Sequence, residues 1–156
     1  MTRLTGAERR PDPIADQQFY AGVAARRLAA FAIDLAVVAV IMGGLISLGF
    51  VLGFLTFGIG LIVIIPALAI AGFVYRYTLI TERSATLGMM AMGIELRDGA
   101  GQRLDGMTAA LHTLAFTAML HIPFALLASL VFSLINPRGQ LLHDVLFGTV
   151  MINRPL

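Results

Sequence analysis

The sequence of 156 residues contains no cysteine, no tryptophan and no lysine. Without cysteine, a disulfide, a thiolate metal site and a cysteine nucleophile are all excluded. Charged residues make up only 13% of the chain, against roughly 25% in soluble domains, and the mean hydropathy is +0.88. All eleven basic residues are arginine and the net charge is only +2, so we expect no nucleic-acid partner. This composition indicates the lipid bilayer as the main partner.

Two long stretches lack charge, and the longer one lies between Asp34 and Arg76. Because a membrane helix needs only about 20 apolar residues, this stretch predicts two transmembrane helices, at about residues 26–48 and 57–77. The glycine-rich GFVLGFLTFGIG between them reads as the turn. A cleavable signal has a much shorter apolar core, so we expect the first helix to remain as a signal anchor.

The second uncharged stretch predicts a third apolar block over residues 108–135, which contains Pro123. As one helix it reaches about 42 Å and spans with tilt, whereas two halves of about 20 Å form a helical hairpin. Both alternatives stay open. The fold class is therefore an all-α polytopic membrane protein. Its polar segment GIELRDGAGQRLDG predicts a small β-hairpin at the cytoplasmic surface, with GTVMI at 148–152 as a candidate third strand.

The arginines give the orientation of the chain. They flank the first two predicted helices, while the loop between these helices has no basic residue. The positive-inside rule then places the N-terminus and residues 78–106 in the cytoplasm. We divide the chain into a flexible cytoplasmic tail, 1–19, and one membrane domain, 20–153. Gly49 and Gly53 have the GxxxG spacing of close helix packing, a weak signal in a chain with 16 glycines.

Asp34 is the acid inside the first predicted helix. The apolar residues of this helix favour insertion by roughly 3–7 kcal/mol, and a central aspartate opposes it by about 2.5–3.5 kcal/mol. The helix therefore inserts, but Asp34 needs a polar partner. Arg27 lies within about 20° of the same helix face, yet about 10.5 Å away along the axis. Asp144, in LLHDVLFGTV, is the other candidate partner of Arg27, unless it is a surface carboxylate on an interfacial helix.

The histidines and the known catalytic motifs give little support for an enzyme. His112 and His121 point to opposite faces of a continuous helix, and we expect no shared metal site. His143 is a weaker candidate for a proton relay with Asp144, since neighbouring residues on a helix diverge by about 100°. HExxH, GxSxG and nucleotide-binding motifs do not occur in a suitable context. We expect no catalytic residue and no cofactor.

Three separated motifs resemble the RDD family of bacterial membrane proteins, which is named for one arginine and two aspartates. Arg27, Asp34 and Asp144 match these three positions, and ATLGMMAMGIELRDGAGQRLDGMTAAL resembles the segment after the second helix of the family. The similarity covers roughly residues 20–153. Met89 and Val145 depart from it, because the family often has a basic residue at each of these positions.

The resemblance implies a largely uncharacterised protein for which transport of ions or unidentified ligands has been suggested. We expect a multi-pass protein of the bacterial cytoplasmic (inner) membrane, assembled as a homo-oligomer or with other membrane proteins. Arg27, Asp34 and Asp144 would form its charged cluster, with His143 and Arg26 as weaker candidates. The alternative is a scaffold or accessory subunit in which the same cluster fixes helix packing.

Overall fold

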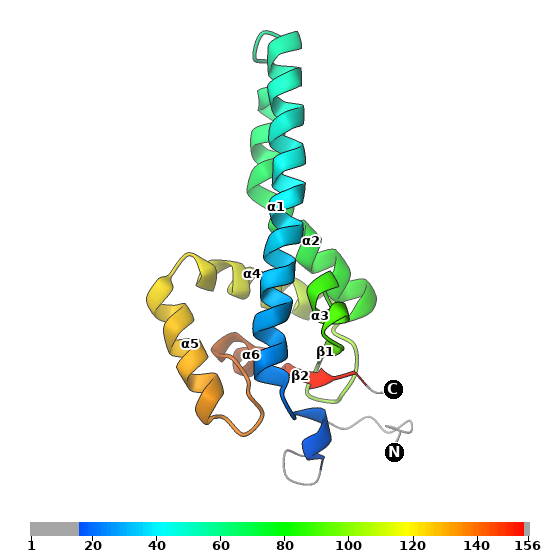
Figure 1. The fold of residues 1–156 in the computed structure, drawn as a ribbon, viewed down its shortest axis with the longest axis vertical. Helices are drawn as coiled ribbons and strands as arrows, with labels where there is room; N and C mark the ends of the chain where they lie inside the picture. The colour runs from blue at the N-terminus through cyan, green and yellow to red at the C-terminus, as the bar shows by residue number, and fades with distance from the viewer. Residues whose placement is uncertain (1–15, 155–156) are drawn as a thin grey trace.

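The computed structural model describes residues 16–154, so most of the predicted tail, 1–19, lies outside the described residues. The first element is a short 3-10 helix, η1 (Gln17–Phe19), followed by the long helix α1 (Val23–Leu55). Helix α2 (Leu61–Arg83) returns beside α1, and the two project together beyond the rest of the molecule (Figure 1). The two predicted helices are confirmed, and both are long and apolar enough to cross a bilayer.

The turn between α1 and α2 is shorter than the sequence suggested. Residues 49–55 of the predicted glycine-rich turn are helical, and only residues 56–60 connect the helices. The glycines of this stretch allow close packing: a Cβ on Gly49 would lie 2.7 Å from Cγ2 of Ile64, and one on Gly53 would lie 3.3 Å from Leu61. The GxxxG spacing is thus a contact between α1 and α2.

The third apolar block is not one straight helix. It forms α4 (Gly106–Leu120) and α5 (Pro123–Ile135), which are bent by 114° relative to each other. Pro123 stands in the first turn of α5, where its missing N–H costs no hydrogen bond. The described residues therefore contain two candidate spans, or three if this bent pair crosses as a broken span.

The predicted β-hairpin is wrong. Strand β1 (Ile94–Arg97) pairs with β2 (Val150–Asn153) in an antiparallel two-stranded sheet, so the candidate third strand is the real partner. The segment after β1 turns instead of returning as a strand, because the Asp98 carboxylate accepts hydrogen bonds from the amides of Ala100 and Gln102. Leu104 is buried in the core and is not paired on the sheet.

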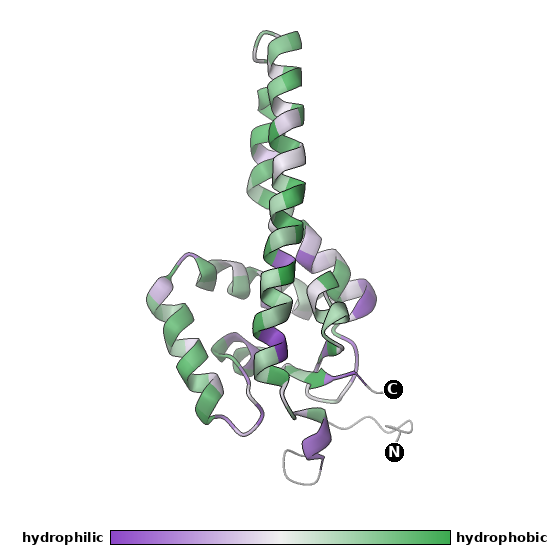
Figure 2. Cartoon of the chain, in the orientation of Figure 1, coloured by the Kyte–Doolittle hydropathy of each residue, from purple (hydrophilic) through white to green (hydrophobic). Residues whose placement is uncertain are grey.

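Polar and apolar parts of the molecule separate clearly in space. Figure 2 shows the projecting α1–α2 hairpin as almost wholly apolar, with the polar residues gathered toward the end that carries both termini. Phe50 and Phe54 on the hairpin are about four-fifths exposed, as expected for side chains that face lipid. The buried core lies at the opposite end, where the start of α1 packs against α3 (Leu87–Ala91) and the sheet.

Candidate functional site: a buried charged cluster beside an apolar cavity

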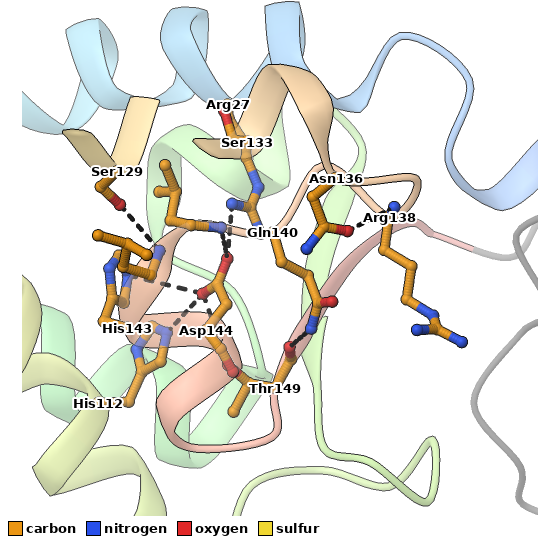
Figure 3. A network of polar contacts seen from close by, with 12 residues as sticks. Arg27, His112, Ser129, Ser133, Asn136, Arg138, Gln140, His143, Asp144 and Thr149 are labelled. Carbon is orange, nitrogen blue, oxygen red and sulfur yellow. Dashed lines mark hydrogen bonds and ion pairs between the residues drawn. The ribbon is translucent and has the colours of Figure 1, made fainter. Parts of the chain in front are cut away.

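Asp144 is the centre of a buried ionic network. It lies on the short helix α6 (Leu142–Leu146) and is only 1% exposed, so it is not a surface carboxylate. Its Oδ2 is 2.7 Å from Nη1 of Arg27 on α1, and its Oδ1 is 2.9 Å from Nε2 of His112 on α4. Figure 3 shows the side chains of Arg27 and His112, from two different helices, converging on the carboxylate of Asp144. The predicted partnership of Arg27 with Asp144 is therefore present as a direct ion pair.

Backbone and side-chain hydrogen bonds fix α6 in place. The Leu142 amide donates to Ser129 Oγ on α5 at 2.9 Å, and the Leu141 amide donates to Asp144 Oδ2 at 3.0 Å. After the helix, the Thr149 amide donates to the Asp144 carbonyl at 2.8 Å. These bonds satisfy the ends of a helix too short to be stable alone, so the position of Asp144 depends on α5 and the start of β2.

Burial and charge act in opposite directions on Asp144. Burial alone would raise the pKa of its carboxyl, but the charge of Arg27 and the hydrogen bond with His112 hold that pKa well below its usual range. His143 is also buried, with Nε2 3.5 Å from Asp144 Oδ1. Burial lowers the pKa of His143 to about 3, against the opposing effect of Asp144. The network therefore holds an ionised carboxylate and a neutral His143 at neutral pH.

Asp34 has a separate set of partners and is not bonded to Arg27. Its Oδ1 accepts from the Tyr75 hydroxyl at 2.7 Å and from the Gly88 amide at 2.8 Å, and its Oδ2 accepts from the Thr86 hydroxyl at 2.6 Å. All three donors are neutral, and they come from α2 and from the start of α3. The carboxylate is thus held by oriented dipoles, which explains how an acid that is only 7% exposed is tolerated.

Gly88 brings α3 into direct contact with α1. A Cβ at this position would overlap the carbonyl oxygen of Ala30 and lie 2.8 Å from Asp34 Oδ1. Only glycine therefore lets its own amide reach the carboxylate. The adjacent Met89 is 4% exposed and packs in the apolar core, so this chain has no charge where the family often has a basic residue.

Arg76 on α2 is a further charged group of this region, which the sequence suggested only as a marker of the helix end. It is 9% exposed, and its guanidinium carbon lies 3.8 Å from the centre of the Phe116 ring. This is the geometry of a cation–π contact. No carboxylate of the described residues lies within 4 Å of it. The sequence signal that could have pointed to Arg76 was its position inside α2, seven residues before the end of that helix.

A cavity of about 150 Å³ joins these groups. Arg27, Asp34, Arg76, His112, His143 and Asp144 all contribute to its wall. The rest of the lining is apolar and comes from α1, α4, α5 and neighbouring segments, including Phe31, Leu126 and Leu130. The two carboxylates bind different partners, but they face one shared space.

A family model, the RDD family, matches residues 20–148 of the chain and so covers all three charged positions of the motif. The chain belongs to the RDD family. In this RDD protein, the arginine and the second aspartate of the motif form an ion pair, and the first aspartate is held by neutral donors. Comparison with curated proteins and with solved structures gives no match.

The RDD protein also brings together three groups that could ligate a metal. One ligand atom from each of His112, His143 and Asp144 lies within 4.8 Å of the others. A metal-bound histidine normally donates its second ring N–H to an acceptor. Here Nδ1 of both histidines is buried without a hydrogen-bond partner among the described residues, and Asp144 is already paired with Arg27. The geometry fits a hydrogen-bonded ionic network better than a metal centre.

The remaining predicted residues lie apart from the network, with one exception. Arg26 is exposed and donates to the Met92 carbonyl at 3.3 Å. His121 is exposed at the end of α4, with Nδ1 2.8 Å from the Thr117 carbonyl oxygen. The exception is His143, which is buried with Asp144 and places its Nε2 3.5 Å from Asp144 Oδ1, although neighbouring residues on a helix diverge. Sequence reasoning also missed His112, since its partner lies on another helix.

Proposed function

We propose that this RDD protein is a small transport component for ions or small solutes in the bacterial cytoplasmic membrane. The cavity is the observation that carries the proposal, because two buried acids, the buried Arg76 and the largely buried Arg27 contribute to one wall inside a helical membrane domain. Ionisable groups in such a position are rare and mark ion or substrate pathways. Arg27, Asp34 and Asp144 are the residues to which we assign binding.

The length of α1 supports a position of the charged cluster close to one face of the membrane. Its 33 residues reach about 50 Å, whereas the hydrocarbon core is about 30 Å thick. From Leu55 back to Asp34 the helix rises about 31 Å. With the α1–α2 turn at one face of the bilayer, Asp34 then lies close to the opposite face. The arginines near that end favour the cytoplasm by the positive-inside rule, with the N-terminus inside.

Assembly completes the proposal. Two or three helices enclose little space for a pathway, and the α1–α2 hairpin projects without cover from the other elements (Figure 1). We therefore propose a homo-oligomer, or a complex with other membrane proteins, in which neighbouring hairpins extend the pathway that begins at the cavity.

The test is flux through the purified protein in lipid vesicles, recorded for protons and for monovalent cations. Asp34→Asn removes the charge of the first aspartate, and Glu82→Gln, at an exposed position near the end of α2, is the matched control. We expect Asp34→Asn to abolish flux and Glu82→Gln to retain it. Equal flux from Asp34→Asn and the wild type would remove Asp34 from the mechanism.

A second candidate function is a membrane scaffold or accessory subunit without transport. The observation in its favour is that each carboxylate already has close partners that link α1 to other elements: Asp34 to α2 and α3, and Arg27 to α6. In that case the cluster is a packing device. Asp34→Asn would then lower the folded yield or change the proteins that co-purify, with no change in any flux.

A further inference from the structure

Arg76 is a buried cation that has no acidic partner within 4 Å in the part of the chain that the structure describes. Its guanidinium stacks on Phe116, and its Nε has no hydrogen-bond partner among the described residues. The two nearby carboxylates are engaged elsewhere: Asp144 by Arg27 and His112, and Asp34 by neutral donors. A charge removed from water without a partner is costly. Asp34 and Asp144 attract the Arg76 guanidinium without contacting it, so Arg76 is the charged group on the cavity wall that has no direct anionic contact among the described residues.

The cavity wall around Arg76 is suited to an apolar chain. Four of its lining residues, Leu28, Phe31, Leu120 and Leu130, are also between 36% and 69% exposed. Exposed apolar side chains of α1, α4 and α5 therefore border the cavity. These apolar walls match the chemistry of an aliphatic chain.

We propose that Arg76 binds the head of a single-chain anionic amphiphile, a long-chain carboxylate, that enters the cavity sideways from the membrane. The carboxylate accepts hydrogen bonds from the N–H edge of the guanidinium, whose face remains against Phe116. The cavity, about 150 Å³, holds the head and the first part of the chain, and the rest extends past Leu130 into lipid. This inference goes beyond the proposed function, because it adds a long-chain anion as a ligand of the same cavity.

The absence of tryptophan from the sequence gives a direct assay. Phe116→Trp introduces a single fluorophore beside Arg76 and keeps an aromatic face under the guanidinium. The full chain in phosphatidylcholine nanodiscs at neutral pH is titrated with dibrominated stearate, whose bromines quench tryptophan. We expect saturable quenching. In the same background, Arg76→Gln should raise the ligand concentration at half-saturation by about tenfold or more, which is the loss of affinity expected when a charged hydrogen bond is removed.

Matched probes and variants identify what the site recognises. Arg83→Gln, at the exposed end of α2, makes the same charge change and should leave quenching unchanged. The methyl ester of the same acid should quench without saturation, and acetate or inorganic phosphate should not compete. The proposal is refuted if Arg76→Gln and Arg83→Gln give equal curves, if the ester binds like the acid, or if acetate or phosphate competes.

Two further measurements separate the outcomes. Arg76→Lys keeps the positive charge, so this variant should fold even if Arg76→Gln does not. Its affinity for the brominated stearate should lie between the affinities of the wild type and of Arg76→Gln. Native mass spectrometry should show that stearate binds the unmodified chain with the same affinity as the Phe116→Trp protein that retains Arg76. If no bound stearate is detected, the proposal is overturned. Because binding is read without a gradient, intact flux without quenching refutes this inference alone, and intact quenching without flux refutes the proposed transport alone.

Discussion

Replacement of Gly88 by alanine should break the contact between α1 and α3. The added Cβ overlaps the Ala30 carbonyl oxygen, so α3 must move away from α1. Its amide then loses the 2.8 Å hydrogen bond to the buried Asp34. Overpacking costs about 1–3 kcal/mol and a hydrogen bond to a charged group contributes about 1.5–3 kcal/mol. Alanine returns about 0.5–1 kcal/mol of backbone entropy, which leaves a net loss of roughly 2–5 kcal/mol.

The assay is equilibrium unfolding of the purified protein in detergent, with Gly43→Ala as the control. Gly43 lies in α1, where a new Cβ meets nothing within 4 Å, so the control should be neutral or slightly more stable. A double-mutant cycle then isolates the hydrogen bond: in an Asp34→Asn background, Gly88→Ala should cost less than in the wild type. The reasoning is refuted if Gly88→Ala is as stable as Gly43→Ala, or if the cycle shows no coupling.

Three other predictions follow from the packing, the electrostatics and the topology. Gly49→Leu places side-chain atoms against Ile64, so it should reduce unfolding stability by at least about 1–3 kcal/mol, whereas Gly43→Leu, in open space, should not. Because the pKa of His143 falls to about 3 from 6.5, the unfolded chain binds more protons between these values. The free energy of unfolding should therefore fall as the pH is lowered from 6.5 to about 3. Equilibrium unfolding measured over a series of pH values should show this fall, and His143→Gln should make it smaller. The lowered pKa of Asp144 also makes the folded state less stable on acidification, at lower pH than for His143. Reporters fused to the two ends should report the same side of the membrane, since Asp144 pairs with the start of α1; opposite sides would contradict this arrangement.

Features set by local composition could be predicted from the sequence. The scarcity of charge predicts membrane helices whatever their neighbours, and the two spans were found although their ends shifted by several residues. Arg27, Asp34 and Asp144 stood out because a charged residue is costly in an apolar segment. Pro123 marked the break in the third block, but its 114° bend depends on how α4 and α5 pack.

Tertiary structure decided which of these groups meet. Thr86 and Gly88 lie 52 and 54 residues from Asp34 in the chain, and no periodicity within one helix predicts a contact at such a distance. The same limit hid the pairing of β1 with β2 and the role of Arg76. The sequence by itself determined that this chain is a helical membrane protein with a few costly charges. Only the packing of α1 against α2, α3 and α6 decided that Asp34 is held by neutral donors, that Arg27 pairs with Asp144, and that Arg76 has no acidic partner within 4 Å among residues 16–154.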